Sequence, residues 1–162
     1  MNVLIAYSSG YGTTREIAEK IAGVLGETGG LKITLQSIDD IEDIKEFDAV
    51  IVGSSVRAER PLANVRDFFA RNSDKLAKKK VAIFAVCLTA NSDVGRDKVK
   101  NEYISHITDK YPAIIPISIE AFGGKIDFDR LNPVMQQLMR SVLKKTGVET
   151  SGTVDTRDWE FI

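Results

Sequence analysis

The sequence contains one cysteine and one histidine among its 162 residues. The single cysteine, Cys87, cannot form an internal disulfide. One histidine supplies neither a metal site nor a Ser-His-Asp triad, so we expect His106 to be a surface residue. An excess of either charge is also missing, since 22 basic and 23 acidic side chains leave a net charge of −1. No overall field therefore attracts nucleic acid or an acidic membrane.

Long apolar runs are absent as well. No segment approaches the roughly 20 apolar residues of a transmembrane helix, and the start of the chain lacks the basic region of a secretion signal. We therefore expect a cytoplasmic protein in a reducing compartment. A composition of 43% hydrophobic and 28% charged residues is typical of a globular protein, and the length predicts one domain over residues 1–162.

Apolar runs alternate with helical patterns along the chain. Runs bounded by turn or polar residues predict strands, and apolar spacings of three and four residues predict helices between them. The predicted strands are 3–7, 32–37, 48–53, 81–86 and 113–119. Strands that are apolar throughout and separated by helices imply a parallel sheet covered on both faces, so we predict a doubly wound, five-stranded α/β domain.

Local signals bound the predicted helices. The first helix begins at Thr13 and ends before the glycine pair at 29–30. A second is opened by Pro61, because a proline at the first helical position loses no hydrogen bond. A third is capped by Ser92 or Asp93. Each of these helices connects two of the predicted strands.

The clearest helical pattern follows the fifth strand. Apolar residues from Leu131 to Leu143 recur on one side and predict an extra amphipathic helix over 131–146. Basic side chains surround this stripe, and no acidic residue occurs between Arg130 and Gly147. The helix could pack on the sheet as core, in place of a closing helix, or form an interaction surface. The sequence leaves both interpretations open.

In an open parallel sheet, ligands bind at the carboxyl ends of the strands. The loop after the first strand comprises Ser9, Gly10, Tyr11, Gly12, Thr13 and Thr14. Its hydroxyls, its two glycines and the helix N-terminus that follows suit one phosphate group. It lacks the lysine of a nucleoside-triphosphate loop, and Arg15 replaces the third glycine of a dinucleotide fingerprint. The alternative is a glycine-rich turn that only begins a helix.

This loop, within residues 5–18, resembles the FMN phosphate loop of the flavodoxin superfamily, whose pattern is Thr/Ser-x-Thr-Gly-x-Thr. Tyr11 stands in place of the middle threonine. The resemblance implies a flavodoxin-like sheet with strand order 2-1-3-4-5 and FMN as the cofactor. It also implies that the flavin ring lies between two further loops. These loops consist of Ser54, Ser55, Val56 and Arg57, and of Cys87, Leu88, Thr89 and Ala90.

The sequence also resembles a narrower group, the flavodoxin-type protoporphyrinogen oxidases, in residues 14–18, 52–57 and 129–159. That group passes electrons from a porphyrinogen through FMN to menaquinone, and the helix after the fifth strand is its characteristic insertion. The resemblance implies an FMN-dependent oxidoreductase with at most peripheral membrane contact and no side chain acting as acid or base. The alternatives are a non-enzymatic flavodoxin electron carrier and a module that binds another phosphate. Substrate, redox partner and oligomeric state stay open.

Two residues lie next to the ring position that the resemblance implies. Arg57 could bind a substrate carboxylate or stabilise reduced flavin, or be a solvated arginine at a loop tip. We interpret Cys87 as a small buried hydrophobe rather than a nucleophile. Carriers commonly have a glycine in the second loop, whose peptide flips toward flavin N5. Because residues 55–57 lack one, we expect no long-lived one-electron-reduced flavin.

Overall fold

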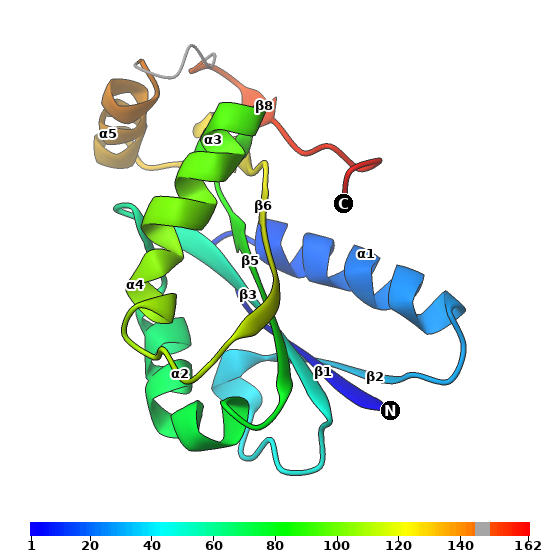
Figure 1. Cartoon of the computed structure of the whole chain (residues 1–162). Helices are drawn as coiled ribbons and strands as arrows, with labels where there is room; N and C mark the ends of the chain where they lie inside the picture. Colours follow the sequence, from blue (N-terminus) through cyan, green and yellow to red (C-terminus); the bar gives the residue numbers. More distant parts are fainter. Residues whose placement is uncertain (145–149) are drawn as a thin grey trace.

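The computed structural model describes residues 1–144 and 150–162. Five parallel strands form its central sheet, and they lie in the order β2-β1-β3-β5-β6 (Figure 1). Their bounds are β1 Asn2–Ser8, β2 Lys32–Ser37, β3 Ala49–Arg57, β5 Lys80–Val86 and β6 Pro116–Phe122. This order confirms the predicted doubly wound, flavodoxin-like α/β sheet.

Helices cover the two faces of the sheet (Figure 1). One face carries α1 (Thr13–Glu27), and the other carries α2 (Ala63–Leu76), α3 (Asp93–Lys98) and α4 (Ser105–Thr108). A π-helical stretch, Val99–Tyr103, joins α3 to α4. Short 3-10 turns lie at Ile38–Asp40, Leu88–Ala90 and Phe128–Arg130. No helix within the described ranges is long and apolar enough to cross a bilayer.

The larger core lies between the sheet and the helices α2 to α4. Val52 and Ile83 of the strands meet Phe68 and Phe69 of α2 there, and all four side chains are buried. A smaller core on the opposite face brings Ile17 of α1 against the sheet. These all-apolar strands therefore bury both of their faces, as parallel strands do.

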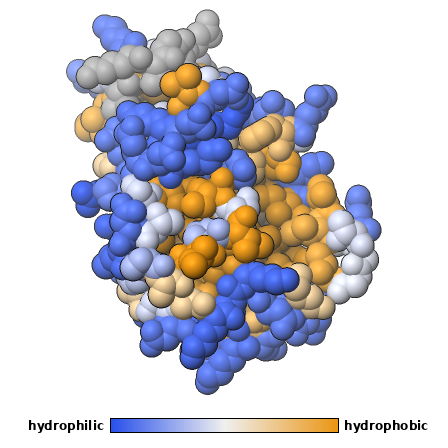
Figure 2. Space-filling view, viewed as in Figure 1, coloured by the Kyte–Doolittle hydropathy of each residue, from blue (hydrophilic) through white to orange (hydrophobic). Residues whose placement is uncertain are grey.

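Apolar surface remains at the β6 edge of the sheet. Ile115 and Ile117, before and at the start of β6, are largely exposed. Figure 2 shows apolar residues gathered over the middle of this face of the molecule, between hydrophilic regions above and below. The end of the chain covers another part of β6, where the ring centroid of Phe161 lies 5.9 Å from that of Phe122.

The predicted fifth strand, 113–119, is placed three residues too early. The N–H of Ile114 donates to the Tyr111 carbonyl at 2.9 Å and closes a turn, so the strand begins only at Pro116. Proline is tolerated at the first residue of a strand, where its missing N–H breaks no ladder bond. Ile114 is buried although it precedes the strand, which explains why the apolar pattern begins early.

The prediction that Pro61 opens a helix is wrong. Pro61 belongs to a short strand, β4 (Arg60–Pro61), which pairs antiparallel with the end of β3 through Val56. Ala58 and Glu59 form the turn of this hairpin with positive φ angles of 50° and 60°. Residues 54–57, predicted as a loop, are therefore the last part of β3.

A small subdomain follows β6 and lies over the carboxyl ends of the sheet strands (Figure 1). It contains the antiparallel pair β7 (Lys125–Asp127) and β8 (Thr153–Asp155), which the sequence did not predict, and α5 (Pro133–Leu143). The predicted extra helix is confirmed over 133–143, whereas residues 145 and 146 lie outside the described part. The capping side chain is Asn132, which accepts the N–H of Met135 at 2.9 Å.

The helix α5 does not replace a closing helix on the sheet. Its inner side contributes Leu143 to a separate apolar cluster, which also contains Leu88, Phe128 and Leu131. Val134 on its outer side is 77% exposed. The apolar stripe therefore covers the loop after β5, and the interpretation as sheet core is wrong.

Candidate cofactor site

The loop between β1 and α1 presents unpaired backbone donors. Gly12 occupies the N-cap of α1 with φ 90°, a conformation that costs glycine little, and no side chain caps this helix. Its carbonyl accepts the N–H of Glu16 at 3.1 Å. Within the described residues, no acceptor contacts the N–H groups of residues 13–15. Such donors at a helix N-terminus bind phosphate well.

Hydroxyl groups hold the loop in shape. The Ser9 hydroxyl accepts the N–H of Gly12 at 2.9 Å. Ser55, from the end of β3, accepts the N–H of Gly10 at 3.3 Å and shares a hydrogen bond of 2.7 Å with the Thr14 hydroxyl. Thr14 is fully buried. Ser55 therefore ties the first predicted loop to the second.

Arg57 supplies the positive charge that the loop itself lacks. A Cβ added at Gly10 would lie 3.3 Å from Nη2 of Arg57, so the guanidinium contacts this glycine. The side chain is exposed, and it extends over the loop instead of pointing away as a solvated loop-tip arginine would. The arrangement brings a guanidinium next to the unpaired N–H groups.

Two glycines, Gly95 and Gly124, pack closely against the loop after β5. A Cβ added at Gly95 would meet the Thr89 carbonyl oxygen at 1.8 Å, and one at Gly124 would lie 3.2 Å from the carbonyl carbon of Cys87. Only glycine allows the first of these approaches. Leu88 packs into the cluster beneath α5. The backbone of this loop is therefore held closely by its neighbours.

The thiol of Cys87 is not activated. Its side chain packs against the larger core, and burial raises the pKa of the thiol above its usual value. A raised pKa keeps the group protonated near neutral pH, where it is a poor nucleophile. This supports the interpretation of Cys87 as a small apolar residue.

The subdomain contacts the first loop directly. The Thr13 hydroxyl donates to the Lys125 carbonyl at 3.4 Å. A cavity of about 270 Å³ lies at this junction, and Tyr11, Lys125 and Leu131 are among its lining residues. Tyr11 is 68% exposed at its rim. The junction therefore offers an aromatic ring, two aliphatic side chains and charged groups of both signs beside this loop.

Arg157 fastens the end of the chain to α1. It forms an ion pair with Asp155 at 2.6 Å and another with Glu16, and its guanidinium lies 4.6 Å from the Trp159 ring centroid. The hydrogen bond from Arg157 lowers the pKa of Asp155. Only 5% of the Arg157 side chain is exposed, so this pair is more than a surface contact.

All three predicted segments lie at the carboxyl edge of the sheet, but not every side chain faces outward. Ser54 is buried and accepts the N–H of Leu62 at 3.0 Å, so it stabilises the hairpin. Val56 and Ala90 pack against the larger core. Lys125 was missed, because nothing local to it indicates a contact with a loop more than one hundred residues away.

The residues present fit a bound phosphate ester. The loop combines unpaired N–H donors, a hydroxyl-rich lining and one guanidinium, the donor set that recognises phosphate. Individual contacts of these residues with FMN remain predictions.

Comparisons with known proteins agree with this geometry. The model of the flavodoxin domain family matches residues 4–153. Over 170 aligned residues the chain is 26% identical to protoporphyrinogen IX dehydrogenase (quinone) of Escherichia coli strain K12, covering 100% of this chain and 91% of that protein.

Solved structures share the fold. Two-electron reduced flavodoxin from Megasphaera elsdenii has a TM-score of 0.59 and 20% identity, covering 74% of this chain and 84% of the flavodoxin. A flavoprotein from Lactobacillus acidophilus in complex with FMN has a TM-score of 0.56 and 18% identity, covering 74% of this chain and 91% of its own.

Proposed function

The chain belongs to the flavodoxin domain family, and from this premise we propose that it is an FMN-dependent oxidoreductase that passes electrons from a porphyrinogen to a quinone. The observation that carries the proposal is the pairing of a phosphate-binding loop with the subdomain above it. The first feature accounts for cofactor binding. The second lies within the alignment with the quinone-linked dehydrogenase, which covers the whole chain.

When bound, FMN supplies the electron-transfer chemistry, and the protein supplies binding and orientation. The N–H groups of residues 13–15 and the guanidinium of Arg57 hold the phosphate. Ser55 keeps the loop and the end of β3 in register. The end of β3 and the loop after β5 would position the ring, and the cavity of about 270 Å³ beside Tyr11 would take one edge of the substrate.

The subdomain gives the site its apolar surroundings. Leu88 and Phe128 lie in the cluster that carries α5, so the helix and the flavin-side loop form one packed unit. On the outer side of α5, Val134 and Leu138 are exposed. We place this surface against the membrane that dissolves the quinone, as a peripheral contact of a cytoplasmic protein.

Anaerobic turnover tests the proposal. FMN-loaded protein is mixed with protoporphyrinogen IX and a water-soluble quinone, and porphyrin fluorescence is followed against a control with free FMN. The expected result is quinone-dependent fluorescence that exceeds the free-FMN rate. Porphyrin formation no faster than with free FMN would refute the assigned reaction.

A non-enzymatic carrier remains the alternative from the same fold. It would exchange electrons with a partner protein and show no porphyrinogen turnover. The turnover assay therefore separates the two functions, provided that FMN binding has been measured first.

A further inference from the structure

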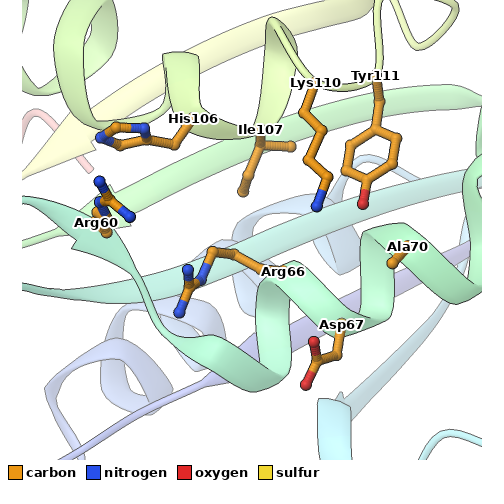
Figure 3. Close-up of a pocket in the computed structure, with 8 residues that line it drawn as sticks. All are labelled: Arg60, Arg66, Asp67, Ala70, His106, Ile107, Lys110 and Tyr111. Carbon is orange, nitrogen blue, oxygen red and sulfur yellow. The ribbon is translucent and has the colours of Figure 1, made fainter.

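A second cavity lies away from the cofactor site. It measures about 330 Å³ and lies between α2 and α4 (Figure 3). Arg60, Arg66 and Lys110 contribute three cationic side chains to its lining, against one carboxylate, that of Asp67. His106 adds a further nitrogen donor from α4. None of these residues is among those predicted to hold the flavin.

The cationic groups come from three segments, namely β4, α2 and the stretch just after α4. In Figure 3, Arg60 of β4 and the guanidinium of Arg66 lie on the same side of the view. Lys110, which follows α4, extends toward α2. The carboxylate of Asp67 points away from Lys110 in this view. Asp67 is therefore poorly placed to neutralise the charge between the helices.

Arg66 has a hydrogen-bond donor without an acceptor among the described residues. Its Nε is buried and has no hydrogen-bond partner among the described residues. Burying a charged donor without an acceptor is costly, and such a group usually marks the place of a water or an ion. The Arg66 side chain lines the cavity together with the cationic side chains of Arg60 and Lys110, so an anion bound there would balance their charge.

One other cation of the same helix does have an acidic partner. Lys75, at the far end of α2, forms an ion pair of 2.7 Å with Asp43. Within the described part of the chain, Arg60, Arg66 and Lys110 form no ion pair with a carboxylate. Like charges brought together without a counter-charge repel one another, so this arrangement favours an external anion.

We propose that the cavity between α2 and α4 binds a small organic anion through phosphate or carboxylate groups. Arg66 is the central ligand, because its planar guanidinium matches the two oxygens of either group. Arg60 and Lys110 balance the remaining negative charge. Ile107 and the ring of Tyr111 give the cavity an apolar wall for a short carbon skeleton.

Calorimetric titration of the FMN-loaded protein tests this site while the phosphate loop is occupied. Pyrophosphate and citrate are the probes, with potassium chloride as the control for ionic strength. We expect at least one probe to bind, and the one that binds tells whether the site takes phosphate or carboxylate. Binding of neither up to about 10 mM would overturn the proposal.

Variants locate the binding. Arg66→Gln should weaken it at least about tenfold, the effect of losing a charge-assisted hydrogen bond. Arg66→Lys keeps the charge but removes the guanidinium fork, and should also weaken binding. Arg71→Gln, at an exposed arginine of the same helix, is the matched control and should bind as the wild type does. Lys110→Gln gives a second test at an exposed position if the Arg66 variants unfold.

The proposal would be overturned if Arg66→Gln bound the probe with the affinity of the wild type. If the Arg66 variants do not fold, unchanged affinity in Lys110→Gln would overturn it. Equal losses in the Arg66→Gln and Arg71→Gln variants would overturn it as well, because they would indicate diffuse attraction by the surface.

Discussion

Replacing Arg57 by glutamine tests how the phosphate is held. The side chain contacts Gly10 of the phosphate loop through Nη2, and the loop has no other cation inside it. A charge-assisted hydrogen bond to phosphate is worth more than a neutral one, but the exposure of Arg57 screens it. We therefore expect Arg57→Gln to cost about 1–2 kcal/mol of binding, or about a 5–30-fold rise in the Kd for FMN.

Titration of the flavin by fluorescence, with FMN and with riboflavin, measures this effect. Riboflavin lacks the phosphate, so its Kd should not change in the variant, and the wild-type preference for FMN should shrink as salt rises. Arg71→Gln controls for the loss of one positive charge. An equal loss for both flavins would place Arg57 at the ring, and an unchanged Kd for FMN would refute the pairing altogether.

Other predictions address the supports of the site. Ser55→Ala leaves the buried Thr14 hydroxyl without its partner and should cost about 1–3 kcal/mol in urea unfolding, so an unchanged midpoint would contradict this reading of the loop. Arg157→Met should lower stability at pH 7. Because Arg157 lowers the pKa of Asp155 in the folded state, this contribution is present above the unfolded pKa of about 4 and is lost in more acidic solution. The difference in unfolding free energy between variant and wild type should therefore become smaller below about pH 4. Leu138→Gln should reduce co-sedimentation with anionic vesicles, and equal co-sedimentation would remove α5 from the membrane contact.

The central strands of the sheet could be predicted because they are largely buried on both faces. A strand such as Val81–Val86 is apolar at every position, which leaves few other structures for it. The fifth strand was misplaced because Ile114 is apolar and buried while lying in a turn. Burial alone does not separate a strand from the turn that precedes it.

The hairpin at the end of β3 gave no local signal. Such turns usually contain glycine or asparagine, whereas Ala58 and Glu59 adopt positive φ here. Glu59 is held from outside the hairpin, since the Tyr103 hydroxyl donates to its carboxylate at 3.3 Å and Lys98 lies 3.7 Å away. A conformation that depends on a distant helix cannot be read from the turn itself.

The candidate site was predicted in part for a similar reason. The phosphate loop is contiguous, so its glycines and hydroxyls are visible together in the sequence. The contact of Arg57 with Gly10 and that of Thr13 with Lys125 depend on how the sheet edge and the subdomain are placed. Whether the side chains of Ser54 and Ala90 point outward or into the core also depends on packing, which composition does not indicate.

Stepwise anaerobic reduction of the FMN-loaded protein, followed by absorption, distinguishes an oxidoreductase from an electron carrier. Val56 and Arg57 are paired with β4, and Ser55 with β5, so a peptide flip in this segment would break strand pairing. We expect the spectrum to pass from oxidised to fully reduced flavin without a strong one-electron band. A strong band at intermediate reduction would contradict the oxidoreductase and favour a carrier, and failure to bind flavin would contradict the whole assignment.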